Sequence, residues 1–194
     1  MVLPGKQFDS DAALGKAMET FWVRGYEATS VQDLVDSMGI DRGSLYATFG
    51  DKRQVFVAAL RRYDDHYRKA WVNGLASTMA PRAVILSVFE DGIAAALGAK
   101  AREGCLLVNA ALELSPQDPE VGHIVSSAFV EMERFFQAMI EAAQAEGAVP
   151  RRIVATEAAA GLLSLFLGLR VLARASPKPE MLQAIRKQAE LLIT

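Results

Sequence analysis

A short stretch that begins at Arg42 combines side chains that suit contact with a nucleic acid. The planar guanidinium of Arg42 matches the two acceptors on the major-groove edge of guanine, although a phosphate contact fits it nearly as well. Ser44 and Thr48 carry hydroxyls that can bond to a base or a phosphate. Gly43 and Ala47 are small and allow close approach. Together these types predict a surface that contacts a nucleic-acid strand.

The stretch must be a helix to present these side chains together, and the sequence predicts two short helices around it. Ser30 is a good N-cap, and Asp33 three residues later makes this start close to a capping box. Gly39 can take the left-handed conformation that ends the first helix. Asp41 can cap the second helix, or it can accept a hydrogen bond from cytosine N4. This pattern describes a helix-turn-helix whose second helix enters the major groove.

The run from Gly25 to Phe56, GYEATSVQDLVDSMGIDRGSLYATFGDKRQVF, resembles the DNA-binding domain of the TetR/AcrR family of bacterial transcriptional repressors. The matching pieces are Gly25-Tyr26, Thr29-Ser30-Val31, Gly39-Ile40, Gly43-Ser44-Leu45-Tyr46, and Phe49 with Lys52 three residues on. The resemblance covers about residues 8–70, and beyond it only the helical character and the length match. Ala47-Thr48 and Gly50-Asp51 depart from the commonest family pattern, which leaves the operator sequence open.

The resemblance implies a set of DNA-contacting residues and a double-stranded DNA operator as partner. The set is Thr29, Ser30, Arg42, Gly43, Ser44, Tyr46, Ala47, Thr48 and Lys52. Tyr46 is expected to reach a phosphate with its hydroxyl, or alternatively to be a half-buried core aromatic. Thr29 or Ser30 is expected to face a phosphate at the start of its helix, and Lys52 to anchor another.

The expected fold class is all-α, with about nine helices in two domains. Residues 1–52, after a loose arm at 1–8, form a three-helix helix-turn-helix domain, and residues 53–194 a helical ligand-binding and dimerisation domain. A fourth helix at 51–74 links them, with a break from Gly74 to Pro81. Helical periodicity and Gly/Pro punctuation predict the remaining helices at 82–97, 102–114, 118–145, 153–174 and 178–193. Family resemblance implies a homodimer through the last two helices; their apolar faces could instead pack within one monomer.

Composition limits the other function classes. The net charge is −2, yet residues 42–69 hold seven Lys/Arg against three Asp, so basic charge is local and suits a short DNA site. A single cysteine fits a reducing cytoplasm, and the N-terminal residues lack an apolar core of signal-peptide length. The apolar stretch 153–169 contains Glu157 and is expected to be a buried helix, not a membrane span. The 52% hydrophobic content favours a dimer interface or an apolar cavity.

Cys105 is the one residue outside the motif with a specific chemical hypothesis. It follows Gly104 near an expected helix start, with Lys100 and Arg102 nearby, and such surroundings favour a reactive thiolate that senses oxidants or electrophiles. The stretch is similar to a Gly-Cys pattern, followed by apolar residues and Asn, in a subset of TetR-like regulators, only some of which use the cysteine as a sensor. The alternative is a small buried hydrophobic residue.

A ligand pocket is expected in the C-terminal half, although an aromatic and methionine stripe can equally be core. The candidate lining is Phe89, Cys105, Leu106, Asn109, Phe129, Met132, Phe136, Phe166 and Arg170, with Asn109 and Arg170 as the polar members that orient a ligand. His66 and His123 have no second ligand at metal spacing, so neither a metal nor a cofactor is expected. No catalytic constellation indicates an enzyme.

Three hypotheses follow from the sequence. The first is a homodimeric repressor that a small-molecule inducer releases from a palindromic operator by moving the fourth helix. The second is the same repressor switched by oxidation or electrophile modification of Cys105. The third, of another class, is a helical small-molecule-binding protein without DNA function.

Overall fold

The computed structural model describes residues 8–98, 103–175 and 178–194, and within these ranges the chain is entirely helical, as the sequence predicts. The elements are α1 (Ser10–Arg24), α2 (Val31–Met38), α3 (Arg42–Phe49), α4 (Lys52–Tyr63), η1 (Asp64–Lys69), α5 (Ala70–Thr78), α6 (Pro81–Leu97), α7 (Leu106–Glu113), α8 (Pro119–Ala145), α9 (Ala155–Ala173) and α10 (Pro179–Leu191). Most of the expected arm at 1–8 lies outside the described residues, as do Lys100 and Arg102.

The linking helix is longer than the sequence predicts. Elements α4, η1 and α5 follow one another without a gap and continue through Gly74 to Thr78. The break lies within the expected stretch from Gly74 to Pro81, but the predicted helix end at Gly74 is wrong, because a single glycine inside a helix is tolerated. The chain leaves helical geometry at Met79 and Ala80, and Pro81 then takes the first position of α6, where its missing N–H is harmless.

The middle of the linking helix is a π-helical segment, η1, that the sequence did not predict. Its wider turn carries a group of charged side chains. Arg68 contacts the carboxylates of Asp64 and Glu131, and Lys69 Nζ lies 2.9 Å from Asp65 Oδ1. Because a π-turn shifts the phase of the helix, it sets the directions in which Tyr67 and the residues after it project.

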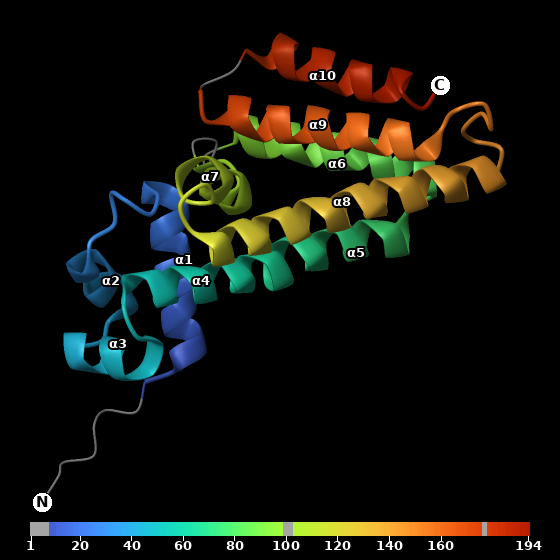
Figure 1. The fold of residues 1–194 in the computed structure, drawn as a ribbon. Helices are drawn as coiled ribbons and strands as arrows, with labels where there is room; N and C mark the ends of the chain where they lie inside the picture. Colours follow the sequence, from blue (N-terminus) through green and yellow to red (C-terminus); the bar gives the residue numbers. More distant parts are fainter. Residues whose placement is uncertain (1–7, 99–102, 176–177) are drawn as a thin grey trace, which may run out of the picture.

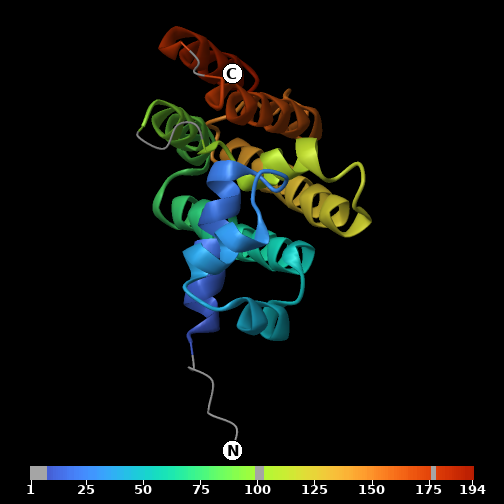
Figure 2. The same ribbon diagram turned by 90° about the vertical axis from the view of Figure 1, so that its left-hand side faces the viewer.

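Two hydrophobic clusters form the core, and their boundary differs from the expected domain boundary. One cluster joins the head, which we define as α1 to α4, to α7 and the first turns of α8; Leu107 and Val121 share it with Phe56. The other is built from α6, α9, α10 and the second half of α8. Figure 1 shows α4 and α5 running alongside α8, with α10 outermost, and Figure 2 shows the head at the opposite end from α10. Helix α7 therefore packs directly against the head.

Helix α9 is, among the described residues, the one helix long and apolar enough to cross a membrane. Such a helix is weak evidence, because core helices of globular proteins pass the same test. Six of its residues, including Leu162 and Leu169, are buried against neighbouring helices. The sequence predicts a buried helix here, but only part of α9 is buried in the single chain, and the rest of its surface remains accessible.

Candidate nucleic-acid interface and ligand cavity

The α2–turn–α3 unit is fixed by local hydrogen bonds at each helix end. Ser30 Oγ accepts from the Asp33 amide at 3.1 Å, and the Asp33 carboxylate accepts from the Ser30 amide at 2.8 Å, which completes the capping box. Gly39 has φ +71° and ψ +32°, so it ends α2 in the left-handed conformation. The Asp41 carboxylate accepts from the amide of Ser44 at 2.8 Å and from its hydroxyl at 2.9 Å. The role of Asp41 as a cap is confirmed.

These caps hold the two carboxylates in their charged form. Hydrogen bonds from the side chain and backbone of Ser30 lower the pKa of Asp33 to about 2. Hydrogen bonds from the backbone and side chain of Ser44 likewise lower the pKa of Asp41. Both negative charges lie at helix N-termini, where they interact favourably with the helix dipole.

The outer face of α3 is open to solvent. Leu45 is its one buried residue and anchors the helix to the head. The exposed residues are Arg42, Gly43, Tyr46, Ala47 and Thr48, and Ser44 is half-buried. Tyr46 is 49% exposed, so the alternative of a half-buried core aromatic is wrong. The face therefore presents the predicted base- and phosphate-contacting side chains outward.

Thr29 does not belong to this surface. Its side chain is fully buried, and its hydroxyl donates to the Gly25 carbonyl at 2.7 Å. The prediction that this side chain faces a phosphate is wrong, because the hydroxyl closes the turn before α2. Ser30 is exposed, but its hydroxyl is engaged in the capping box. The ammonium of Lys52 lies 4.3 Å from the ring centroid of Tyr26, a cation–π distance, at the start of α4.

A cavity of about 660 Å³ lies between the helices of the C-terminal half and the end of α1. Five of the expected residues line it, namely Cys105, Phe129, Met132, Phe166 and Arg170. Phe89, Leu106 and Phe136 do not line it, since each is fully buried in one of the two core clusters. The Asn109 amide donates to the Glu103 carbonyl at 3.0 Å and lines a separate, smaller groove beside Arg24. For these four residues the prediction of a lining role in this cavity is wrong.

The cavity walls include four aromatic side chains that the sequence prediction omitted, Trp22, Tyr63, Tyr67 and Trp71. The Tyr63 and Tyr67 rings stack 5.6 Å apart at 8°, and Trp22 meets both edge-on. Trp71 stacks on Phe166 at 6.0 Å, and its indole nitrogen donates to Asp91 at 2.7 Å. Tyr63, Tyr67 and Trp71 are spaced four residues apart. That spacing was visible in the sequence but indicated only an apolar stripe.

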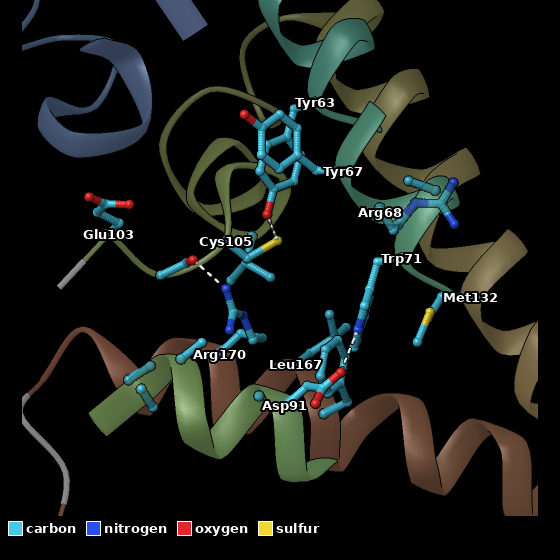
Figure 3. Close-up of a pocket in the computed structure, with 18 of the residues that line it drawn as sticks. Tyr63, Tyr67, Arg68, Trp71, Asp91, Glu103, Cys105, Met132, Leu167 and Arg170 are labelled. Carbon is cyan, nitrogen blue, oxygen red and sulfur yellow. Dashed lines mark hydrogen bonds between the residues drawn. The ribbon is translucent and has the colours of Figure 1, made fainter. Parts of the chain in front are cut away.

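Cys105 lies at the N-cap position of α7, half-buried, at the cavity wall (Figure 3). The Tyr63 hydroxyl donates to its Sγ at 3.6 Å. Burial raises the pKa of Tyr63 well above its usual range, so this hydroxyl stays protonated and remains a donor. The thiol is thus accessible from the cavity and hydrogen-bonded to the linking helix.

Several contacts tie the cavity walls to the head. The Gly104 carbonyl accepts from Trp22 Nε1 of α1 at 3.2 Å and also from the guanidinium of Arg170 on α9. At the other end of α7, the Glu113 carboxylate accepts from the backbone amides of Tyr26 and Glu27, at 3.1 and 2.8 Å. Both ends of the segment that carries Cys105 are therefore hydrogen-bonded to the head.

A third link joins the beginning of α4 to the beginning of α8. Arg53 Nη2 donates to Asp118 Oδ1 at 2.8 Å and to Glu120 Oε2 at 3.0 Å. The bond from Arg53 lowers the pKa of Asp118 to about 2, and Asp118 also accepts from the first amides of α8 as its N-cap. No group of three metal-ligating side chains occurs in the described ranges.

Comparison with known proteins matches both the N-terminal and the C-terminal part of the chain to the same family of regulators. Residues 13–59 match the profile of bacterial regulatory proteins of the tetR family, and residues 82–189 match a tetracyclin repressor-like C-terminal domain. The HTH-type transcriptional repressor ComR of Escherichia coli K12 is 33% identical over 184 residues, 93% of this chain and 86% of ComR. YezE of Bacillus subtilis 168, an uncharacterized HTH-type transcriptional regulator, is 34% identical over 131 residues, 68% of each chain.

A solved structure extends the similarity to three dimensions. It is the TetR family transcriptional regulator CifR, with three cysteine substitutions, complexed with 26-bp double-strand operator DNA. It is 30% identical to this chain, covers 95% of this chain and 96% of its own, and superimposes with a TM-score of 0.82.

Proposed function

Because this chain belongs to the TetR family of transcriptional regulators, we propose that it is a homodimeric repressor that binds a palindromic DNA operator in the cytoplasm. The observation that carries the proposal is the exposed outer face of α3 within a chain that matches the family along both halves. Arg42 at the start of α3 is the strongest candidate for reading a base. The third hypothesis, a protein without DNA function, is set aside because the relatives are transcriptional regulators.

The dimer would form through α9 and α10. Both helices keep large apolar side chains exposed in the single chain, including Val171 at 43%, Met181 at 47% and Leu191 at 65%. Within one chain α9 and α10 already pack closely, because a Cβ at Gly161 would meet Leu192 Cδ1 at 2.9 Å. Exposed apolar surface on two adjacent helices supports burial against a second copy. Two heads per dimer would then face two operator half-sites.

The cavity is the proposed inducer site. Tyr63, Tyr67 and Trp71 of its wall belong to the helix that continues from the head. A ligand that fits the cavity better when this helix is displaced would favour the displaced state, in which the separation of the two heads no longer matches the half-sites. The coupling is reciprocal, so bound DNA must weaken ligand binding by the same factor.

The DNA-binding proposal is tested with the duplex upstream of the protein's own gene. Arg42→Ala should weaken binding by about tenfold or more at matched salt, because a base-reading arginine contributes about 1–3 kcal/mol. Arg151→Ala removes an exposed arginine outside the helix-turn-helix and should leave binding unchanged. Equal affinity of Arg42→Ala and the unsubstituted protein would remove α3 as the reading helix.

A second signal is favoured by the place of Cys105 at the cavity wall. Hydrogen peroxide that entered the cavity would transfer one oxygen to the thiol, forming a sulfenic acid and releasing water, and the added oxygen would change the contact between Cys105 Sγ and the Tyr63 hydroxyl. Oxidant-driven release of DNA that a reductant reverses, and that Cys105→Ser abolishes, would support this signal. Release that persists in Cys105→Ser would exclude it.

A further inference from the structure

Arg170 is a cation inside the cavity that has no carboxylate partner. Its guanidinium donates to the Gly104 carbonyl, and no ion pair involves it among the described residues. Every Asp and Glu of the sequence lies within those residues, so no carboxylate of this chain neutralises Arg170. The side chain is half-buried, and an unpaired charge in that position is unfavourable unless a counter-charge arrives.

The second arginine of the cavity shows the contrast. Arg68 also lines the wall, but the carboxylates of Asp64 and Glu131 both contact its guanidinium. Arg68 is therefore already compensated and offers little attraction to an anion. Of the two arginines that line the cavity, Arg170 alone has no acidic partner.

Charged side chains line the cavity on both sides. Figure 3 shows Arg170 beside Cys105 on one side of the open space, and Trp71 with Asp91 on the other. The aromatic rings of Tyr67 and Phe166 also line the cavity. The carboxylates of Asp91 and Glu103, which both line it, would repel an anion, whereas Arg170 would attract it. A flat ring system between the aromatic walls would stack or meet them edge-on.

We propose that the cavity binds a flat aromatic compound with one anionic group, a carboxylate or a sulfonate, that pairs with Arg170. Guanidinium matches such groups in a two-point geometry, and charge-assisted hydrogen bonds are about twice as strong as neutral ones. The rings lie against the aromatic wall of Tyr67, Trp71 and Phe166, and the anionic group lies at Arg170, on the side away from the carboxylate of Asp91. This inference rests on the proposed function only in taking the cavity as the inducer site, and it names the chemical class of the inducer.

Two dyes with one ring system separate charge from shape. 8-Anilinonaphthalene-1-sulfonate carries a sulfonate, and N-phenyl-1-naphthylamine has the same rings without it. The chain has two tryptophans, Trp22 and Trp71, and both line the cavity, so energy transfer from tryptophan reports dye bound in or near it, and the Arg170 and Asp91 variants locate the dye. Affinities come from titrations of the full-length protein at fixed salt, without DNA.

Arg170→Met should weaken the sulfonate dye by about tenfold or more, because a hydrogen bond to a charged group contributes that factor, and leave the neutral dye within about twofold. Arg151→Met is the matched control and should change neither affinity. Asp91→Asn keeps an acceptor for Trp71 and removes a repelling charge, so it should tighten the sulfonate dye by about twofold and not the neutral one. This second variant keeps the test decisive if Arg170→Met folds poorly.

The outcomes separate the two proposals. An unchanged affinity of Arg170→Met for the sulfonate dye, or an equal loss for both dyes, overturns the anion assignment and leaves the cavity as a ligand site. If Asp91→Asn changes the affinity for the neutral dye as much as the affinity for the sulfonate dye, the anion assignment is overturned as well. Failure of the unsubstituted protein to bind either dye overturns this inference together with the cavity as inducer site, while the DNA-binding proposal stands on its own test.

Discussion

The α2–α3 unit and the cavity differ in how far along the chain their parts lie. In the α2–α3 unit each decisive contact joins residues about three positions apart, as in the Ser30–Asp33 and Asp41–Ser44 caps. In the cavity, Trp22 donates to the Gly104 carbonyl across 82 positions. Local contacts form an outward-facing surface of fixed shape, whereas the distant contacts enclose a space between several helices. The comparison indicates that the shape of the α2–α3 unit is set by local contacts, whereas the shape of the cavity depends on how distant helices pack.

The two regions also differ in how completely they are packed. Leu34 and Leu45 fill the core of the head and have no exposed surface. The C-terminal half leaves about 660 Å³ unfilled next to Leu163 and its neighbours. Unfilled space costs contacts that a close-packed interior would make, so the cavity is retained at the expense of stability.

The largest expected effect tests this difference in packing. Leu45→Ala should lower the free energy of unfolding by about 3 kcal/mol. Leu45 is the only buried residue of α3, so its truncation leaves a new cavity between α3 and the rest of the head. Leu163→Ala should lower the free energy of unfolding by about 1 kcal/mol, because it enlarges a space that already exists. Urea unfolding followed by circular dichroism measures both. Similar losses would show that the cavity wall is as tightly constrained as the head.

The helix-turn-helix was predictable because its information is local. Ser30, Gly39 and Asp41 are residue types with specific preferences for helix ends, and the structure uses each one as expected. Thr29 was misassigned for the same reason. A threonine before a helix can face outward or bond back to the chain, and its type alone does not distinguish these.

The cavity was predictable only in part, because its lining depends on packing between distant helices. Phe129 and Phe136 lie on the same helix with equally apolar surroundings in the sequence, yet only Phe129 reaches the cavity and Phe136 is core. The aromatic wall from the linking helix depends on η1, and no residue in that segment signals a π-turn. The sequence predicts Asn109 and Arg170 as the polar members, but only Arg170 lines the cavity, and its lack of an acidic partner is visible only in the structure.

A smaller effect is expected from the helix caps of the head, and the dependence of the melting temperature on pH tests it. The folded-state pKa of Asp33 is about 2, lower than its ordinary value of 3.8. The stabilisation from its ionised form is therefore complete above pH 3.8 and is lost as the pH falls toward about 2. Asp33→Asn should flatten the decline of the melting temperature in this interval. Asp36→Asn, on the exposed side of the same helix, should leave the decline unchanged. A decline equally steep in both variants would assign it to other carboxylates.

The smallest expected effect separates two roles of Lys52 at the edge of the reading surface. Its cation–π contact with Tyr26 contributes about 0.5–1 kcal/mol at most, so Lys52→Gln should lower the free energy of unfolding by less than 1 kcal/mol. If its ammonium also contacts a phosphate, the substitution should reduce the dependence of operator affinity on salt by about one counterion. Lys16→Gln removes the same charge from the exposed side of α1 and should leave the salt dependence unchanged. An unaltered salt dependence for Lys52→Gln would assign the side chain to the packing of the head alone, and the phosphate contacts would then come from α3 and the start of α2.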